Sequence, residues 1–193
     1  MPKVAEKSKT SSRPSSLDAQ AWIEAALDIL ADRGVDGIRV DTLAKTLGVT
    51  KGSFYWHFKD RKAFMSAIMN DWRRRATTAI ITTLENRHEE PKVRLHRLLR
   101  LPYSGRHSQR DNMLDLSMRL WGRHDPDARA ALEEIDNLRL RFIGQLLEQN
   151  GLDPAVSRTR AIILYSYLRV SPTLISRNDA MTLEMCEEFL CAP

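Results

Sequence analysis

The stretch LAKTLGVTKGSFYWHFKDRKAFMSAI, residues 43–68, sets the organisation of the N-terminal part of the chain. It predicts that a short helix over 40–47 ends at Gly48, because glycine readily takes the left-handed conformation that stops a helix. A second helix, over 50–58, follows after a short link. This layout is typical of a helix-turn-helix, whose second helix enters the major groove of DNA.

The second helix has an apolar inner side and a polar, aromatic outer side. With Phe54 and Phe58 turned inward, its outer surface carries a cation, hydroxyl groups and aromatic rings, on Lys51, Gly52, Ser53, Tyr55, Trp56 and His57. The alternative is that the side chains of the Tyr-Trp-His-Phe run only pack in a hydrophobic core. Spacing alone favours DNA binding over that alternative.

The charge of the chain is concentrated near its N-terminus. The 193 residues carry a formal net charge of +5, and residues 1–75 hold 14 Lys and Arg against 9 Asp and Glu, whereas residues 76–193 hold 16 of each. Such asymmetry indicates either a polyanionic partner at one end or a basic, solvated tail. Composition leaves these two interpretations level.

The composition also limits the class of protein. No apolar run approaches the roughly 20 residues that span a bilayer, and the polar, basic N-terminus does not read as a secretory signal. The two cysteines, Cys186 and Cys191, exclude a disulfide framework and suit a reducing cytoplasm. We therefore expect a cytoplasmic protein with no membrane partner.

Hydrophobic periodicity and capping residues predict an all-α fold of about nine helices and no sheet. The expected helices cover residues 17–33, 40–47, 50–58, 60–86, 92–101, 109–123, 126–150, 154–170 and a last stretch from 178 or 179. Ser15 or Ser16 is expected to cap the first, and Ser171-Pro172 to interrupt the eighth. We expect a disordered basic arm over 1–15, a three-helix DNA-binding domain over 16–62, and a helical bundle for ligand binding and dimerisation over 63–193.

The quoted stretch strongly resembles the DNA-binding domain of the tetracycline-repressor (TetR) family, and the resemblance extends over roughly residues 17–70. In that family a turn glycine precedes a recognition helix that ends in Tyr-x-His-Phe, followed by a lysine and an apolar residue in the next helix. The matching positions are Gly48, Tyr55, His57, Phe58, Lys59 and Phe64. Beyond residue 75 the resemblance implies helical architecture only.

The resemblance implies a set of DNA contacts. Lys51 and Gly52 are expected near base edges, and Tyr55 and Trp56 on bases or thymine methyl groups. Phosphate contacts are expected from Ser53, Tyr55 and Lys59, with Thr50 opening the helix and Arg39 as a further phosphate or base contact. His57 either contacts a phosphate or only holds the end of the helix. The basic arm, with Lys3, Lys7, Lys9 and Arg13, either adds a DNA contact or is idle. Because the recognition helix has no arginine, we expect no bidentate arginine–guanine contact from it.

A single helix-turn-helix reads few base pairs, so a two-fold dimer on a palindromic operator is expected. The resemblance places the dimer interface on the last two helices, with the candidate residues Ile163, Tyr167, Leu183, Phe189 and Leu190. The alternative is that these residues only close the C-terminal core.

The resemblance also implies a small-molecule pocket in the C-terminal part. Aromatic and methionine side chains that suit its wall, with two polar groups, are Tyr103, His107, Met113, Met118, Arg119, Trp121, Phe142 and Tyr165. Plain core packing is the alternative for each of them.

Motifs for catalysis, metals and cofactors are absent from the sequence. It has no HExxH, Walker or GxGxxG motif and no G-x-S-x-G elbow, and its two cysteines have no nearby histidine. We therefore predict no catalytic residue, metal or cofactor.

The hypothesis is a regulator, most simply a repressor released from DNA by a small apolar or aromatic ligand. Two alternatives are a DNA-binding regulator without an effector, which predicts a filled C-terminal core, and a small-molecule carrier or enzyme whose helix-turn-helix only packs. The effector, the operator, the regulated genes and the sign of regulation do not follow from the sequence.

Overall fold

The computed structural model describes residues 18–104, 108–176 and 179–192, and within these the chain is helical without any strand. The predicted basic arm over 1–15 lies outside the described residues. The helices are α1 (Ala19–Arg33), α2 (Val40–Leu47), α3 (Lys51–His57), α4 (Arg61–Arg73), α5 (Ala79–Glu85), α6 (Pro91–Arg100), α7 (Ser108–Gly122), α8 (Pro126–Gln149), α9 (Pro154–Leu174) and α10 (Ala180–Cys191). Short 3₁₀ turns lie at η1 (Val35–Gly37) and η3 (Leu101–Tyr103).

The α4 and α5 helices are joined without a break by a five-residue π-helical segment, η2 (Arg74–Thr78). They form one long helix, so the described part of the chain contains nine helices and the all-α prediction is confirmed. The sequence did not predict the π-helical segment. π-Helical segments are rare in proteins, and those that occur are often found at functional sites.

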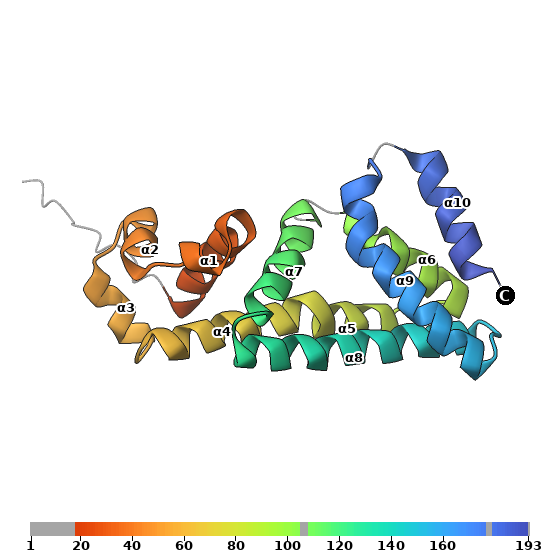
Figure 1. Cartoon of the computed structure of the whole chain (residues 1–193), viewed down its shortest axis with the longest axis horizontal. Coiled ribbons are helices and arrows are strands. Elements are labelled where there is room, and N and C mark those ends of the chain that lie inside the picture. Colours follow the sequence, from red (N-terminus) through yellow and green to blue (C-terminus); the bar gives the residue numbers. More distant parts are fainter. Residues whose placement is uncertain (1–17, 105–107, 177–178, 193) are drawn as a thin grey trace, which may run out of the picture.

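The molecule is elongated, as Figure 1 shows. The helices α1, α2 and α3 lie at one end, and α6, α9 and α10 lie at the other. The long helix α4–α5 and helix α8 run along the molecule and contact each other, while α7 stands between the two ends against α1 and α8. The long helix therefore connects the helix-turn-helix directly to the C-terminal helices.

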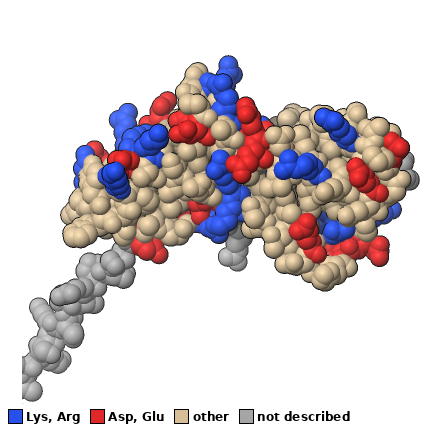
Figure 2. All heavy atoms as spheres, turned by 90° about the horizontal axis from the view of Figure 1, so that it is seen from below, with Lys and Arg blue, Asp and Glu red and all other residues tan. Residues whose placement is uncertain are grey.

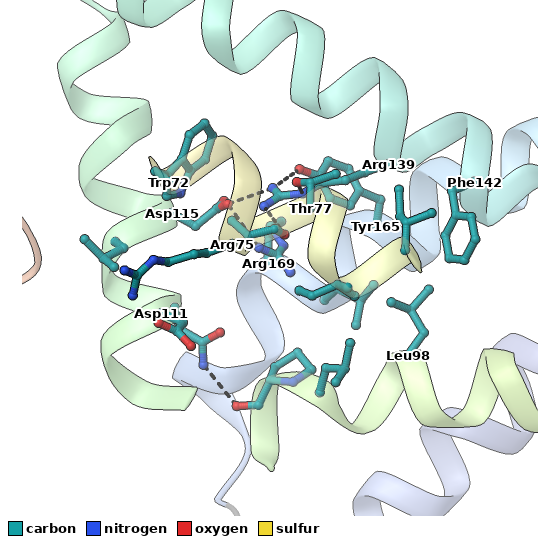
Figure 3. A pocket seen from close by; sticks show the side chains of 18 of the residues that line it. Trp72, Arg75, Thr77, Leu98, Asp111, Asp115, Arg139, Phe142, Tyr165 and Arg169 are labelled. Carbon is teal, nitrogen blue, oxygen red and sulfur yellow. Dashed lines mark hydrogen bonds and ion pairs between the residues drawn. The ribbon is translucent and has the colours of Figure 1, made fainter. Parts of the chain in front are cut away.

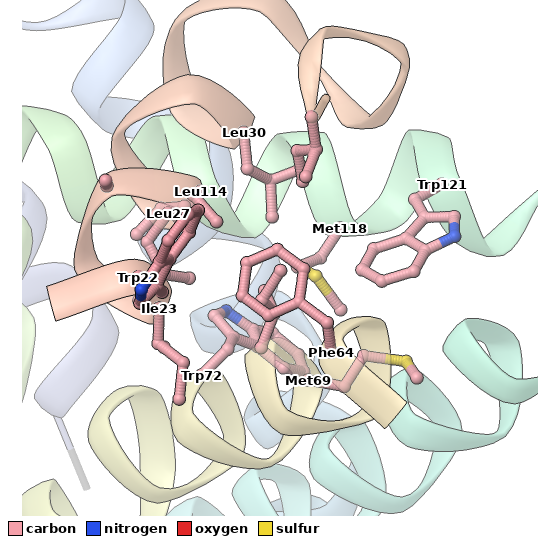
Figure 4. Close-up of a cluster of buried hydrophobic side chains, with 14 of the residues drawn as sticks. Trp22, Ile23, Leu27, Leu30, Phe64, Met69, Trp72, Leu114, Met118 and Trp121 are labelled. Atoms are coloured by element: carbon pink, nitrogen blue, oxygen red, sulfur yellow. The ribbon is translucent and has the colours of Figure 1, made fainter. Parts of the chain in front are cut away.

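Two hydrophobic cores stabilise this arrangement. The first joins α1, α2, α3 and α4 to α7 and the start of α8, and Figure 4 shows Trp22, Leu27, Phe64, Trp72 and Met118 packed within it. The second lies among α5, α6, α8, α9 and α10. The first core thus extends beyond the predicted DNA-binding domain, and the expected boundary between residues 62 and 63 falls within α4.

Two expected helix boundaries are corrected by the structure. The N-cap of α1 is Asp18, whose carboxylate accepts a hydrogen bond from the Ala21 amide at 2.9 Å. The predicted interruption at Ser171-Pro172 is wrong, because α9 continues through Pro172 to Leu174. Proline removes one backbone donor, but near the end of the helix the ladder is closed again by the Ile175 amide, which donates to the Ser171 carbonyl at 2.8 Å.

Candidate nucleic-acid interface and ligand cavity

The turn between α2 and α3 has the geometry that the sequence predicted. Gly48 has φ of 68° and ψ of 27°, the left-handed conformation that favours glycine. Its amide donates to the Ala44 and Lys45 carbonyls, and the Val49 amide donates to the Ala44 carbonyl at 3.0 Å. These bonds end α2. The chain then passes through Val49 and Thr50 and begins α3 at Lys51.

An aromatic cluster fixes the inner side of α3. Phe54 is 1% exposed, and its ring lies 5.4 Å from that of Trp22 on α1 and 5.1 Å from that of Phe64 on α4, centroid to centroid. Phe58, just after α3, lies 4.7 Å from Phe64. Both contacts with α4 mean that a movement of α4 carries α3 with it.

The outer side of α3 is exposed and aromatic. Trp56 is 85% exposed and Tyr55 is 58% exposed, whereas tryptophan side chains in folded proteins are on average mostly buried. Of the other predicted DNA contacts, Arg39, Thr50, Lys51, Gly52 and Lys59 are exposed, and Ser53 and His57 are half-buried. The structure thus gathers the predicted set on one end of the molecule, at and around α3.

Three polar contacts order the ends of this surface. The Lys51 ammonium lies 3.0 Å from Asp41 Oδ1 on α2, and this hydrogen bond raises the pKa of Lys51, so its charge is kept. At the start of α4, Asp60 accepts from the Ala63 amide at 2.8 Å, and Arg61 Nη1 donates to the Ile38 carbonyl at 2.6 Å. Figure 2 shows basic and acidic side chains side by side on one face of the molecule, without a large single-sign patch there.

A cavity of about 390 Å³ lies between η2, α6, α7, α8 and α9. One side is apolar, with Ile80, Ile81, Leu98, Phe142 and Leu168. The other side is polar and is formed by Thr77, Asp115, Arg139, Tyr165 and Arg169, which Figure 3 shows close together. A volume of this size and a few convergent polar groups are typical of small-molecule sites.

The predicted ligand residues divide into three groups. Phe142 and Tyr165 line the cavity, whereas Arg119 does not line it and contacts its polar side through Tyr165, to which its Nη2 donates at 2.9 Å, and through Asp115, which lies 3.3 Å from its Nε. Met118 and Trp121 are buried in the first core, Tyr103 is buried beside the cavity lining, and Met113 is 41% exposed. Their helix faces turn them away from this space. His107 lies outside the described residues.

The centre of the polar side is a buried carboxylate, Asp115 on α7. Its Oδ1 lies 2.7 Å from Arg139 Nη1 and 3.2 Å from Arg169 Nη1, and its Oδ2 lies 3.3 Å from Arg119 Nε. Burial by itself would raise the pKa of Asp115, but the charges of the three arginines outweigh it and lower the pKa. Asp115 is therefore ionised and holds three guanidinium groups together.

Arg139 connects this carboxylate to the π-helical segment. Its Nε donates to Thr77 Oγ1 at 3.0 Å and its Nη2 donates to the Ala76 carbonyl at 3.1 Å. Its Nη1 also donates to the Tyr165 hydroxyl at 2.8 Å. One buried side chain thus links η2 with α7, α8 and α9.

Two more arginines of the cavity wall reach the first helix of the helix-turn-helix domain. Arg75 on η2 forms an ion pair with Glu24 on α1. Arg110 on α7 lies 3.2 Å from Glu24 and 2.6 Å from Asp28. Burial tends to raise the pKa of Glu24, but its bonds with Arg75 and Arg110 lower it overall. The cavity wall and α1 therefore share an ion-pair network.

The sequence analysis missed Asp115, Arg139 and Arg169. A signal for Arg139 does exist, because it occupies a core position in the apolar stripe of α8, between Ile135 and Phe142. A charged residue at such a position needs a buried partner. Which residue supplies the partner depends on how α7 and α9 pack on α8, and that information is not local.

The predicted dimer residues lie in two different environments. Ile163 is 54% exposed and Phe189 is 81% exposed, and Tyr167 is half-buried. Leu183 and Leu190 are buried by their own chain at 9% and 7% exposure, so most of their surface is closed to a partner subunit. Other large apolar side chains are exposed on the same two helices, namely Val156, Ile162, Val170, Leu174, Met181 and Met185.

Known proteins resemble the N-terminal part of the chain. Residues 23–68 match the domain described as "Bacterial regulatory proteins, tetR family". The tetracycline repressor protein class A from transposon 1721, of Escherichia coli, is 41% identical over 54 residues, which are 28% of this chain and 25% of that repressor. The N-terminal domain of this chain is of the TetR type. The matched relatives are repressors and transcriptional regulators, which are not enzymes.

Solved structures extend the similarity from the N-terminal domain to the fold of the whole chain. A transcriptional regulator from Rhodococcus sp. Rha1 covers 91% of this chain and 94% of its own, with a TM-score of 0.72 at 17% identity. AibR, solved with isovaleryl coenzyme A and operator DNA, covers 91% and 98% with a TM-score of 0.67 at 16% identity. The sequence match to the tetracycline repressor spans only a quarter of that relative, so the C-terminal half of this chain is similar in fold alone.

Among the described residues, no cluster of His, Cys, Asp and Glu could hold a metal ion. No helix of the described part is both long and apolar enough to cross a membrane. Cys186 and Cys191 are free thiols, and burial raises the pKa of Cys191 to about 11.

Proposed function

We propose that this chain is a sequence-specific DNA-binding regulator of transcription that acts as a dimer in the cytoplasm. It represses by occupying a palindromic operator and is released when a small ligand binds the C-terminal cavity. The DNA-binding unit is residues 16–62 and the ligand-binding and dimerisation unit is residues 63–193. Base contacts come from Lys51, Gly52, Tyr55 and Trp56, and the remaining predicted residues position the helix on phosphates.

The exposure of Trp56 and Tyr55 carries this proposal. The inner side of α3 is already filled by Phe54 and Phe58, so the structure has no packing role for the Trp56 ring. The two adjacent exposed rings form an apolar surface of the kind that marks an interaction site. A seven-residue helix that follows a tight turn and presents exposed aromatic rings fits the DNA major groove.

Fluorescence anisotropy tests the proposal. The protein is titrated onto labelled DNA from upstream of its own gene at two salt concentrations, with scrambled DNA as competitor. We expect tight binding that resists the competitor and weakens steeply with salt, because phosphate contacts release counterions. If this DNA binds no better than scrambled DNA, a selection from random sequences follows, and failure there would refute the proposal.

The partner on α9 and α10 is proposed to be a second copy of the chain. Val156, Ile163 and Val170 recur every seven residues along α9, and Met181, Met185 and Phe189 recur every four along α10, so each helix carries an exposed apolar stripe. A contiguous apolar surface marks an interaction site, and a two-fold dimer buries the same surface of both copies. The dimer also supplies two recognition helices for the two half-sites of a palindrome.

Replacing Phe189 by glutamate is expected to produce a monomer, because two charged side chains would be buried near each other at the two-fold interface. Light scattering at micromolar concentration measures the mass. Leu120→Glu is the matched control, since Leu120 is 56% exposed and lies on α7 rather than on either of the two proposed interface helices. A monomeric mass for the unmodified protein, or an unchanged dimer for Phe189→Glu, would contradict the proposed interface.

The cavity favours regulation by a ligand over a regulator with a filled C-terminal core. It borders η2, which is continuous with α4, and α4 packs on α3 through Phe64. A ligand that changes the contacts of η2 therefore acts on the spacing of the two recognition helices. The affinities for ligand and DNA are then reciprocally coupled, so a ligand that binds without changing DNA affinity would refute the coupling.

A further inference from the structure

The polar side of the cavity has more positive than negative groups at its deep end. Arg119, Arg139 and Arg169 share the carboxylates of Asp115 and Asp136, and Arg119 is the one that pairs with Asp136, through two bonds of 2.9 Å. The Tyr165 hydroxyl donates to Asp136 at 2.6 Å, so it is not a counter-ion. Three cations therefore face two anions.

The three arginines differ in how fully they are bound. Arg139 has acceptors on Asp115, Thr77, Ala76 and Tyr165, and its side chain is only 10% exposed. Among the described residues, the only ion-pair partner of Arg169 is Asp115, whose Oδ1 lies 3.2 Å away and is shared with Arg139. Within the described part of the chain, the buried Nε of Arg169 has no hydrogen-bond partner.

Arg169 also lies where a ligand can reach it. It lines the cavity, whereas Arg119 does not, and its guanidinium carbon is held 5.5 Å from the centre of the Tyr165 ring. Asp115 offers little to a cationic ligand, because both of its oxygens are occupied by arginines. Asp111, one turn earlier on α7, is exposed and already has an interaction partner.

We infer that the ligand of this cavity is an amphipathic monoanion, a carboxylate on an apolar chain or ring, whose carboxylate binds Arg169 and whose apolar part lies against Ile80, Ile81, Leu98, Phe142 and Leu168. The inference rests on the proposed function and names its class of effector. The carboxylate supplies the missing negative charge and accepts the unused donors of a planar guanidinium group. The apolar part replaces water on the opposite wall.

Isothermal titration calorimetry with matched probes tests the inference. The probes are octanoate and 4-phenylbutyrate, each compared with the alcohol and the amine of the same carbon skeleton. We expect at least one carboxylate to bind about tenfold more tightly than its alcohol, since a charge-assisted hydrogen bond has a strength of this order. The amine is expected to bind least. Equal affinity for acid and alcohol, preference for the amine, or no binding by either acid overturns the inference.

Substitutions of Arg169 test whether this residue causes the preference for the carboxylate over the alcohol. Arg169→Gln is expected to remove the preference for the carboxylate, and Arg169→Lys to keep part of it. The fold is expected to persist in both, because Asp115 still pairs with Arg139 and Arg119. Arg158→Gln is the matched control, since Arg158 is an exposed arginine of the same helix. If Arg169→Gln keeps the full preference while its thermal unfolding is cooperative, the carboxylate binds elsewhere and the inference fails.

Operator binding is measured separately, with the unmodified protein and with Arg169→Gln, in the absence of any probe. If the probes show the expected preference but no DNA binds specifically, the proposed regulator function fails and the carboxylate site stands. If DNA binds specifically and no carboxylate preference is found, the regulator function stands and the ligand class is wrong.

Discussion

Replacing Trp56 by alanine is expected to lower operator affinity by about 100-fold, because a lost base contact costs about 1–3 kcal/mol and the dimer loses one in each half-site. The melting temperature is expected to stay the same, since the side chain is 85% exposed and Phe54 fills the core behind it. Fluorescence anisotropy on the operator gives the affinity and circular dichroism gives the melting temperature.

The controls separate base contacts from phosphate contacts. Leu120→Ala removes another exposed apolar side chain, on α7, and is expected to bind DNA as the unmodified protein does. Lys59→Ala is expected to weaken binding to all sequences and to reduce the salt dependence, because Lys59 is a predicted phosphate contact. An operator affinity of Trp56→Ala equal to that of the unmodified protein would remove the observation that carries the proposed function.

Replacing Asp115 by asparagine is expected to lower the free energy of unfolding by about 3–5 kcal/mol, since breaking a buried ion pair leaves uncompensated buried charge. The substitution would leave three guanidinium groups close together without the carboxylate that offsets their positive charge, namely those of Arg139, Arg169 and Arg119. Urea denaturation measures the loss. The double variant Asp115→Asn/Arg139→Met is expected to recover part of it, because one of the buried cations is removed as well.

The matched control is a salt bridge on the surface. Glu89→Gln removes the negative charge and one of the two oxygens that accept hydrogen bonds from Arg97, at 2.6 and 3.0 Å, and is expected to leave the unfolding curve in place, because exposed ion pairs contribute little. A loss for Asp115→Asn no larger than that for Glu89→Gln would show that Asp115 does not organise the arginines of the cavity.

The same carboxylate gives a pH dependence with a definite sign. The fold lowers the pKa of Asp115 below the value of about 3.9 that an unfolded aspartate has. Its stabilising contribution is therefore complete above pH 3.9 and decreases as the pH falls through the lower pKa of the folded state. The stability difference between the unmodified protein and Asp115→Asn is expected to shrink in that acidic range, and a difference that grew there would contradict the assignment.

Local sequence determined the helix-turn-helix. The turn at Gly48, the inward Phe54 and the outward Trp56 all follow from spacing within about twenty residues, where each helix position fixes the direction of its side chain. The capping pairs Asp125-Pro126 and Asp153-Pro154 likewise placed the starts of α8 and α9 correctly. In these segments hydrogen bonds are local, so the sequence carries the information directly.

Packing decided the features that depend on distant contacts. Met118 and Trp121 are of residue types that often line ligand pockets, yet the packing of α7 places their side chains in the first core. Asp115, Arg139 and Arg169 come from three helices and meet only because α7, α8 and α9 pack together. The same packing lets Arg139 bind the Ala76 carbonyl within the π-helical segment.

The amino-acid sequence by itself thus determined the all-helical class, the helix-turn-helix and the family that its N-terminal domain resembles, because periodicity, caps and turn chemistry act over a few residues. Only the tertiary structure decided which side chains line the cavity, where the buried charges meet, and that Leu183 and Leu190 are core while Phe189 is exposed. The physical reason is that burial and ion pairing depend on the relative placement of whole helices, and no local pattern encodes that placement.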